Sequence, residues 1–200
     1  MKVLESIVVA FSMYSKIPMP HIEWNKENMK NVLCFFPWVG VVAGVLVWLW
    51  FRVSDQLGFG VMLRASVAVL IPVLVTGGIH LDGLLDTADA LSSWQTRERR
   101  LEILKDSNAG AFAVITAGIY FLTWYGAYSQ MWRNGKALLI MAMGFMVSRS
   151  FSGISVVTFP KARKDGTVAE FSRKSEDITV RNVLVIYLAV LLALMVLEKD

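Results

Sequence analysis

Residues 32–51 read VLCFFPWVGVVAGVLVWLWF and contain no charged side chain. A helix of about 20 predominantly apolar residues is long enough to cross a hydrocarbon core of about 30 Å. This stretch therefore predicts a membrane-spanning helix, and with it a protein that folds in a lipid bilayer.

The composition of the 200-residue chain supports a membrane protein. Hydrophobic residues make up 56% of the sequence and charged residues 18%, whereas soluble proteins average about 45–50% apolar and about 25% charged residues. The low charge and the aromatic content of 12% exclude disorder and a coiled coil. The single cysteine, Cys34, excludes a disulfide framework, and we expect it to be a small apolar core residue.

Four further apolar segments follow along the chain. They cover residues 61–79, 109–132, 137–159 and 183–197, and the last is so short that it requires tilt or local thinning of the bilayer. Residues 3–14 are also apolar, but Glu5 and the lack of a small-residue cleavage pattern favour an interfacial or re-entrant helix over a signal peptide. We predict an all-α, polytopic protein, with one membrane domain over residues 1–200 and about five transmembrane helices.

The basic residues indicate the orientation of these spans. The outside segments alternate, with residues 1–31, 80–108 and 160–182 on one face and residues 52–60, 133–136 and the C-terminus on the other. Of the twenty Lys and Arg residues, fourteen lie on the first face and four on the second, while Arg64 and Arg149 lie within spans. The positive-inside rule makes the first face cytoplasmic, as expected for a multi-pass protein of the cell inner membrane.

This distribution accounts for the basic pI of 9.3 without a nucleic-acid partner. The basic residues are spread over three loops, and the sequence contains no nucleic-acid-binding motif. We therefore expect membrane lipid and small molecules as partners, and no nucleic acid. The sequence leaves the oligomeric state open, and a homo-oligomer is compatible with it.

Three aspartates follow the second predicted span, in the sequence TGGIHLDGLLDTADAL of residues 76–91. On a helix, Asp82, Asp86 and Asp89 lie within about 60° of one another and form one acidic stripe. The opposing side is apolar and is expected to be packed; it carries Leu81, Leu84, Leu85, Ala88 and Leu91. Carboxylates without cysteine suit Mg²⁺ or Mn²⁺, and Mg²⁺ is commonly held by one or two carboxylates together with substrate phosphates. The alternative is a solvated acidic surface near a helix start.

Three neighbours of the aspartates are further candidates. His80 lies about 160° round the helix from Asp82, so it is either a substrate contact or base, or a packed interfacial histidine. Gly77 and Gly78 permit the close approach of another backbone or of a phosphate.

Arg149 lies near the middle of the fourth predicted span. An arginine there costs about 2.5–3.5 kcal/mol on insertion scales, so we expect it to face a cavity or a partner. Its guanidinium suits a phosphate or a carboxylate, and pairing with an aspartate is the structural alternative.

Two loops on the face of the aspartates carry further cations. Residues 160–166 contain Arg163 and Lys164, which bind substrate or simply obey the positive-inside rule. The pattern of residues 97–106 predicts a short interfacial helix that has Thr96 as its N-cap. Gly110 is expected to interrupt the backbone before the third span, which leaves residues 106–108 near the cytoplasmic entrance. Acidic residues beside cations at one membrane face predict a magnesium-dependent transferase that cleaves a pyrophosphate.

Residues 76–91 resemble the signature of the cobalamin synthase family, the adenosylcobinamide-GDP ribazoletransferases. Other segments match the family in the same order, namely residues 10–20, 36–40, 97–107, 110–112 and 148–149. Family members usually continue through further apolar sequence, so we expect this chain to be a short or truncated member.

The resemblance implies that adenosylcobinamide-GDP is joined with α-ribazole or its 5′-phosphate. A ribose hydroxyl attacks the phosphorus attached to cobinamide, GMP departs, and Mg²⁺ is required. Carried onto this sequence, Asp82, Asp86 and Asp89 hold Mg²⁺ against the diphosphate, with one of them as base and His80 as a further catalytic candidate. The candidates for substrate and phosphate contact are Gly77, Gly78, Lys105, Asp106, Ser107, Arg149, Arg163 and Lys164.

Two other functions were considered. A CDP-alcohol phosphatidyltransferase also uses an aspartate-rich membrane helix, but Ala88-Asp89 stands where that family has Ala-Arg. A small ion-coupled transporter is the non-enzymatic alternative, because intramembrane ionisable residues often mark ion paths. The aspartates here cluster at one face, whereas carriers place their sites near the midplane.

Overall fold

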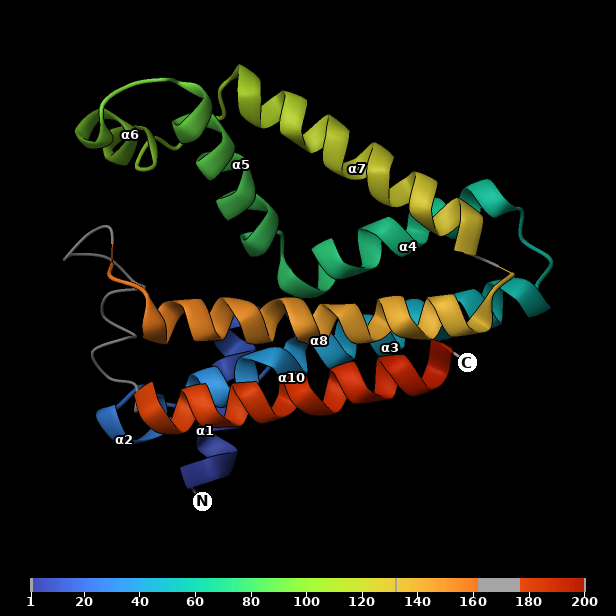
Figure 1. Ribbon diagram of the computed structural model, residues 1–200, viewed down its shortest axis with the longest axis horizontal. Coiled ribbons are helices and arrows are strands. Elements are labelled where there is room, and N and C mark those ends of the chain that lie inside the picture. Colours follow the sequence, from blue (N-terminus) through green and yellow to red (C-terminus); the bar gives the residue numbers. More distant parts are fainter. Residues whose placement is uncertain (1, 132, 162–176, 200) are drawn as a thin grey trace.

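A computed structural model describes residues 2–131, 133–161 and 177–199, and this part of the chain is helical without any strand (Figure 1). The helices are α1 (Lys2–Tyr14), α2 (Lys26–Met29), α3 (Val32–Gln56), α4 (Val61–Thr76), α5 (Ile79–Ser92), α6 (Arg97–Ile103), α7 (Ala111–Met131), α8 (Gly135–Thr158) and α10 (Asp177–Lys199). The predicted all-α class is confirmed.

Four of the described helices, α3, α7, α8 and α10, are long and apolar enough to cross a membrane. The second predicted span is instead a bent pair, because α4 and α5 meet at an angle of 94°. The prediction for the last span was wrong at its start. Its helix begins at Asp177 rather than at residue 183, so residues 177–182 belong to it and not to a loop, and it is long enough to span without thinning.

The helices form two groups (Figure 1). α3, α8 and α10 lie side by side, and the second group lies to one side of them, where α4 packs on α3 while α5 and α7 extend away from α8. The α3–α4 and α7–α8 connections lie at one end of the molecule, while α2, α6 and the start of α10 lie toward the other. Cys34 is buried in an apolar cluster with Leu33, Val180 and Leu184, as expected for a core residue.

Two glycines in the opening stretch let α3 and α8 touch backbone to backbone. A Cβ atom at Gly40 would lie 2.5 Å from the carbonyl oxygen of Phe145, and one at Gly44 would lie 2.5 Å from that of Ala142. Glycines four residues apart lie on one helix face and permit this approach in membranes. The segment that predicts the first span therefore also fixes the position of α8.

The bend between α4 and α5 depends on Gly77 and Gly78. Both have positive φ angles, 65° and 81°, which favour glycine. A Cβ atom at Gly77 would lie 2.5 Å from side-chain carbons of Lys16, whose amide donates a hydrogen bond of 2.8 Å to the carbonyl of Val75. The group that approaches Gly77 is thus a lysine side chain, whereas another backbone or a phosphate was predicted, and a Cβ atom at Gly78 would meet nothing within 4 Å.

Arg64, the other arginine within a predicted span, serves the turn between α3 and α4. It is 5% exposed, and its Nη1 lies 2.7 Å from Oδ1 of Asp55. Its Nε donates to the carbonyl of Phe59, and its own carbonyl accepts a bond from the indole of Trp50. This arginine has a structural role at the end of the molecule opposite α6.

We predict that Gly40→Ala and Gly44→Ala lower the free energy of unfolding by about 1–3 kcal/mol each, because the new methyl group forces two backbones apart. The measurement is unfolding in mixed micelles of detergent and SDS, followed by circular dichroism. Gly118→Ala in α7 is the control, since a Cβ there meets nothing within 4 Å. That control should be neutral or stabilising, because alanine favours a helix over glycine; equal losses for all three variants would contradict the α3–α8 contact.

Candidate active site

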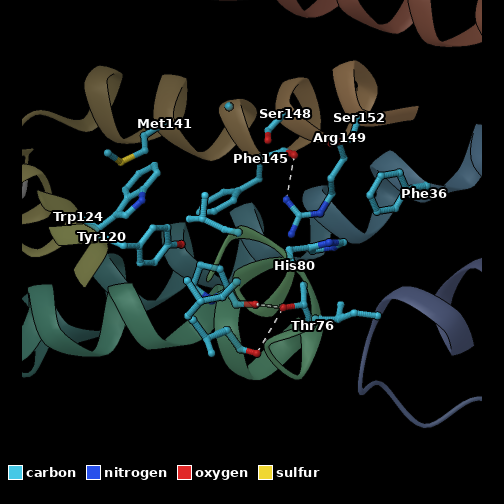
Figure 2. A pocket seen from close by; sticks show the side chains of 17 residues that line it. Phe36, Thr76, His80, Tyr120, Trp124, Met141, Phe145, Ser148, Arg149 and Ser152 are labelled. Carbon is cyan, nitrogen blue, oxygen red and sulfur yellow. Dashed lines mark hydrogen bonds between the residues drawn. The ribbon is translucent and has the colours of Figure 1, made fainter. Parts of the chain in front are cut away.

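A cavity of about 600 Å³ lies between α3, α4, α5, α7 and α8 (Figure 2). Its volume lies within the range of about 300–1,000 Å³ typical of small-molecule sites. It is lined by Phe36, Pro72, Val73, Thr76, Ile79, His80, Leu81, Gly83, Leu84, Tyr120, Trp124, Met141, Gly144, Phe145, Ser148, Arg149 and Ser152. The predictions included only His80 and Arg149 of this set.

Arg149 brings a positive charge to the cavity. Its side chain is 92% buried, since 8% remains exposed, and Figure 2 shows it directed toward His80. Nη1 donates a hydrogen bond of 3.1 Å to the carbonyl of Phe145, while Nε has no hydrogen-bond partner. Within the described residues no carboxylate pairs with it, in contrast to Arg64. The expectation that Arg149 faces a cavity is confirmed, and the alternative of a pair with an aspartate is not found there.

His80 lies beside Arg149 at the same end of the cavity (Figure 2). Its ring centroid is 5.4 Å from that of Phe36 and 6.5 Å from that of Tyr14, with which it is stacked. His80 therefore packs against aromatic rings and also lines the cavity, while its role as a substrate contact or base stays a prediction.

The other end of the cavity is aromatic. Trp124 stacks on Phe145 with ring centroids 6.3 Å apart and an interplanar angle of 15°, and Tyr120 lies 6.2 Å from Trp124. Figure 2 shows Tyr120 and Trp124 on the side away from Arg149 and His80, while Phe145 lies between the two ends, with its ring centroid 5.9 Å from the guanidinium carbon of Arg149. The spacing of Tyr120 and Trp124, four residues apart, was a signal for one aromatic face of α7 that the sequence reasoning did not use.

The acidic stripe lies on a different side of α5 from the cavity. The helix is present over Ile79–Ser92, so the predicted spacing holds, but none of the three aspartates lines the cavity. At 100° per residue, the stripe lies roughly opposite His80 and Leu84. The expectation of a packed apolar side holds only in part. Leu84 and Leu91 are 44% and 59% exposed, whereas Leu81, Leu85 and Ala88 are half-buried. Leu84 is exposed toward the cavity, which it lines together with Leu81.

Asp89 caps the N-terminus of α7. Its Oδ2 accepts a hydrogen bond of 2.6 Å from the amide of Gly110, and its Oδ1 accepts one of 2.9 Å from the amide of Ala113. A Cβ atom at Gly110 would lie 2.7 Å from Oδ1, so the glycine is required for this approach. A carboxylate at this position satisfies free amides and favours the helix dipole. The predicted interruption before the third span thus serves to bind Asp89.

The remaining two aspartates form the part of the stripe that is open to a ligand. Asp82 is exposed and Asp86 half-buried, and neither carboxylate makes a hydrogen bond or ion pair with the described residues. In the part of the chain that the structure describes, no three His, Cys, Asp or Glu residues form a group that could hold a metal ion. Two carboxylates four residues apart nonetheless fit Mg²⁺, which takes its other oxygens from substrate and water.

The predicted substrate contacts after α6 lie away from the cavity. Lys105, Asp106 and Ser107 are exposed in the loop before α7, and Thr96 caps α6 as predicted. Hydrogen bonds from the backbone and side chain of Asn108 hold the pKa of Asp106 below its usual value. The predicted contacts Arg163 and Lys164 lie outside the described residues.

Comparison with known proteins identifies a family. The family model for cobalamin-5-phosphate synthase matches residues 6–198. The adenosylcobinamide-GDP ribazoletransferase of Lachnoclostridium phytofermentans is 46% identical over 190 residues, which are 95% of this chain and 72% of that protein. The proteins of the same name from Clostridium botulinum (strain Eklund 17B / Type B) and Desulfitobacterium hafniense (strain Y51) are 30% and 32% identical, over 92% and 87% of this chain and 73% and 69% of their own lengths. No solved structure matches the chain significantly.

We predict that Asp89→Ala lowers the free energy of unfolding by about 0.5–2 kcal/mol, the usual effect of removing a helix cap. Asp89→Ser should retain most of the stability, because serine also caps helices. Hydrogen exchange at residues 110–114 should rise in Asp89→Ala, since the amides of Gly110 and Ala113 lose their acceptor.

Asp82→Ala is the matched control on the same stripe. Its carboxylate bonds to no described residue, so its removal should leave stability unchanged or slightly higher through reduced repulsion. A loss in Asp82→Ala as large as that in Asp89→Ala would argue against the capping role.

Proposed function

The chain belongs to the cobalamin-5-phosphate synthase family, and we infer from this membership that it joins adenosylcobinamide-GDP with α-ribazole, the reaction for which its relatives are named. The observation that carries this inference is the relative that is 46% identical over 95% of the chain. Membership also favours a transferase over the phosphatidyltransferase and transporter alternatives.

The proposed reaction exchanges one phosphate bond for another. A ribose hydroxyl of the acceptor forms a bond to the phosphorus attached to cobinamide, and the bond from that phosphorus to GMP breaks. GMP leaves with the electron pair of that bond, and the hydroxyl proton passes to a base. Catalysis of such a transfer requires positive charge at the phosphate oxygens and a positioned nucleophile.

We propose that Asp82 and Asp86 hold Mg²⁺ at the diphosphate. Their position on one face of α5, without hydrogen bonds to the described residues, suits an ion that shares its shell with substrate phosphates. When bound, Mg²⁺ reduces the negative charge on the phosphate oxygens and so favours the departure of GMP. Asp89 remains at the end of the stripe, where it fixes α7 relative to α5.

The cavity supplies the other requirements. Arg149 offers a buried guanidinium to a phosphate, and His80 offers a ring nitrogen to a hydroxyl group in the same space. Because Phe36 and Tyr14 pack against His80, its ring is held in place before a substrate enters.

We propose that the protein lies in the cell inner membrane with α5 and α6 facing the cytoplasm. This orientation is supported by the fourteen of twenty basic residues that the alternating spans assign to one face. Apolar side chains on the outer faces of α7 and α10, such as Ile119, Leu122 and Leu197, are 61% to 73% exposed and suit contact with lipid.

We predict that Asp82→Asn and Asp86→Asn each lower Mg²⁺-dependent GMP release by about 100-fold or more, since even outer-shell changes at metal sites cost 10–100-fold. GMP release is measured with adenosylcobinamide-GDP and α-ribazole in proteoliposomes, with and without EDTA. Binding of Mn²⁺ in place of Mg²⁺, followed by electron paramagnetic resonance, should weaken in parallel.

Glu98→Gln is the matched control, because it removes an exposed carboxylate that belongs to α6 and not to the acidic stripe of α5. It should keep normal GMP release and Mn²⁺ binding. Full activity in Asp82→Asn and Asp86→Asn at normal expression would overturn the metal assignment.

A further inference from the structure

We propose that the cavity is the binding site of the acceptor in its phosphorylated form, α-ribazole 5′-phosphate, and that Arg149 binds the 5′-phosphate and sets the preference for it. This inference rests on the proposed function and adds to it the location of one substrate and the residue that selects it.

The size of the cavity indicates which of the two substrates binds inside it. A volume of about 600 Å³ accommodates a nucleotide. A corrinoid joined to a nucleoside diphosphate has several times as many atoms and needs an open surface. The acceptor is therefore the substrate that fits inside the helices.

The two ends of the cavity match the two ends of a nucleotide. Trp124 and Tyr120 provide aromatic surfaces at one end, Arg149 lies at the other, and the ring of Phe145 lies between them, stacked on Trp124 and 5.9 Å from the guanidinium carbon of Arg149 (Figure 2). Flat aromatic bases stack on such side chains irrespective of their hydrogen-bonding pattern. A benzimidazole at the aromatic end would place the sugar phosphate toward the guanidinium.

The state of Arg149 calls for an anion. A buried charge without a partner is unfavourable, and the described residues provide only the carbonyl of Phe145 as acceptor, leaving Nε unpaired. A phosphate oxygen satisfies both the charge and this nitrogen. α-Ribazole itself is uncharged at this position, so it would leave the guanidinium without an anion.

Gly83 connects the cavity with the acidic stripe. It lines the cavity, lies about 60° round the helix from Asp86, and a Cβ atom there would meet nothing within 4 Å. No side chain of Gly83 therefore separates a ribose in the cavity from the side of α5 where the diphosphate is proposed to bind.

The test compares two acceptors in the full-length chain in proteoliposomes, with adenosylcobinamide-GDP saturating. The wild type should show a kcat/KM for α-ribazole 5′-phosphate at least about tenfold above that for α-ribazole, the ratio expected from a charged hydrogen bond. Arg149→Met should abolish this ratio, because it should raise KM for the phosphorylated acceptor at least about tenfold more than KM for α-ribazole.

Arg52→Met is the matched control, since Arg52 is an exposed cation that lies over Trp48 at the opposite end of α3; it should keep the ratio of the wild type. A wild type without preference, or an Arg149→Met variant in which both acceptors lose activity equally, would refute the proposal and indicate that Arg149 binds the diphosphate instead. A wild type that releases no GMP with either acceptor would refute the proposed function itself.

Binding in the absence of the corrinoid keeps the proposal testable if Arg149→Met does not fold. α-Ribazole 5′-phosphate alone should quench the tryptophan fluorescence of the wild type, and Trp124→Phe should lose most of that quenching. Ribose 5-phosphate should compete with the nucleotide. Unchanged quenching in Trp124→Phe, or no binding without the corrinoid, would place the acceptor elsewhere.

Discussion

The backbone contact between α3 and α8 is the constraint on which the candidate site depends. Gly40 brings α3 against the carbonyl of Phe145, and the same carbonyl accepts the hydrogen bond from Arg149. The ring of Phe145 also stacks on Trp124 of α7. Gly40 thus fixes the position of one turn of α8 from the side of α3. The same turn presents the guanidinium of Arg149 and the ring of Phe145 to the cavity.

The two buried arginines within predicted spans, Arg64 and Arg149, differ in how their charge is satisfied. Arg64 is paired with Asp55 and bonds to a carbonyl, so its charge is satisfied within the protein. Arg149 is as deeply buried but has no carboxylate partner among the described residues. Because a buried charge without a partner is unfavourable, Arg149, unpaired among the described residues, is the arginine that suits a bound anion, whereas Arg64 already has Asp55.

Features that depend on local pattern were predictable from the sequence, and those that depend on packing were not. Apolar length predicted the spans, and helical spacing predicted the acidic stripe on α5. The start of α10 was missed because its first turns contain Asp177 and Arg181, which interrupt the apolar run. The capping role of Asp89 and the direction of Arg149 depend on contacts between segments far apart in sequence, which no local pattern encodes.

The 94° bend at Gly77 and Gly78 has a consequence for how two unlike substrates meet. After this turn, α5 runs across the direction of α4 for about 21 Å at 1.5 Å per residue. One side of α5 borders the cavity, and its opposite side carries the exposed Asp82 and the half-buried Asp86. The bend makes α5 a partition one helix thick, so that two molecules of very different size can reach the same helix from different sides.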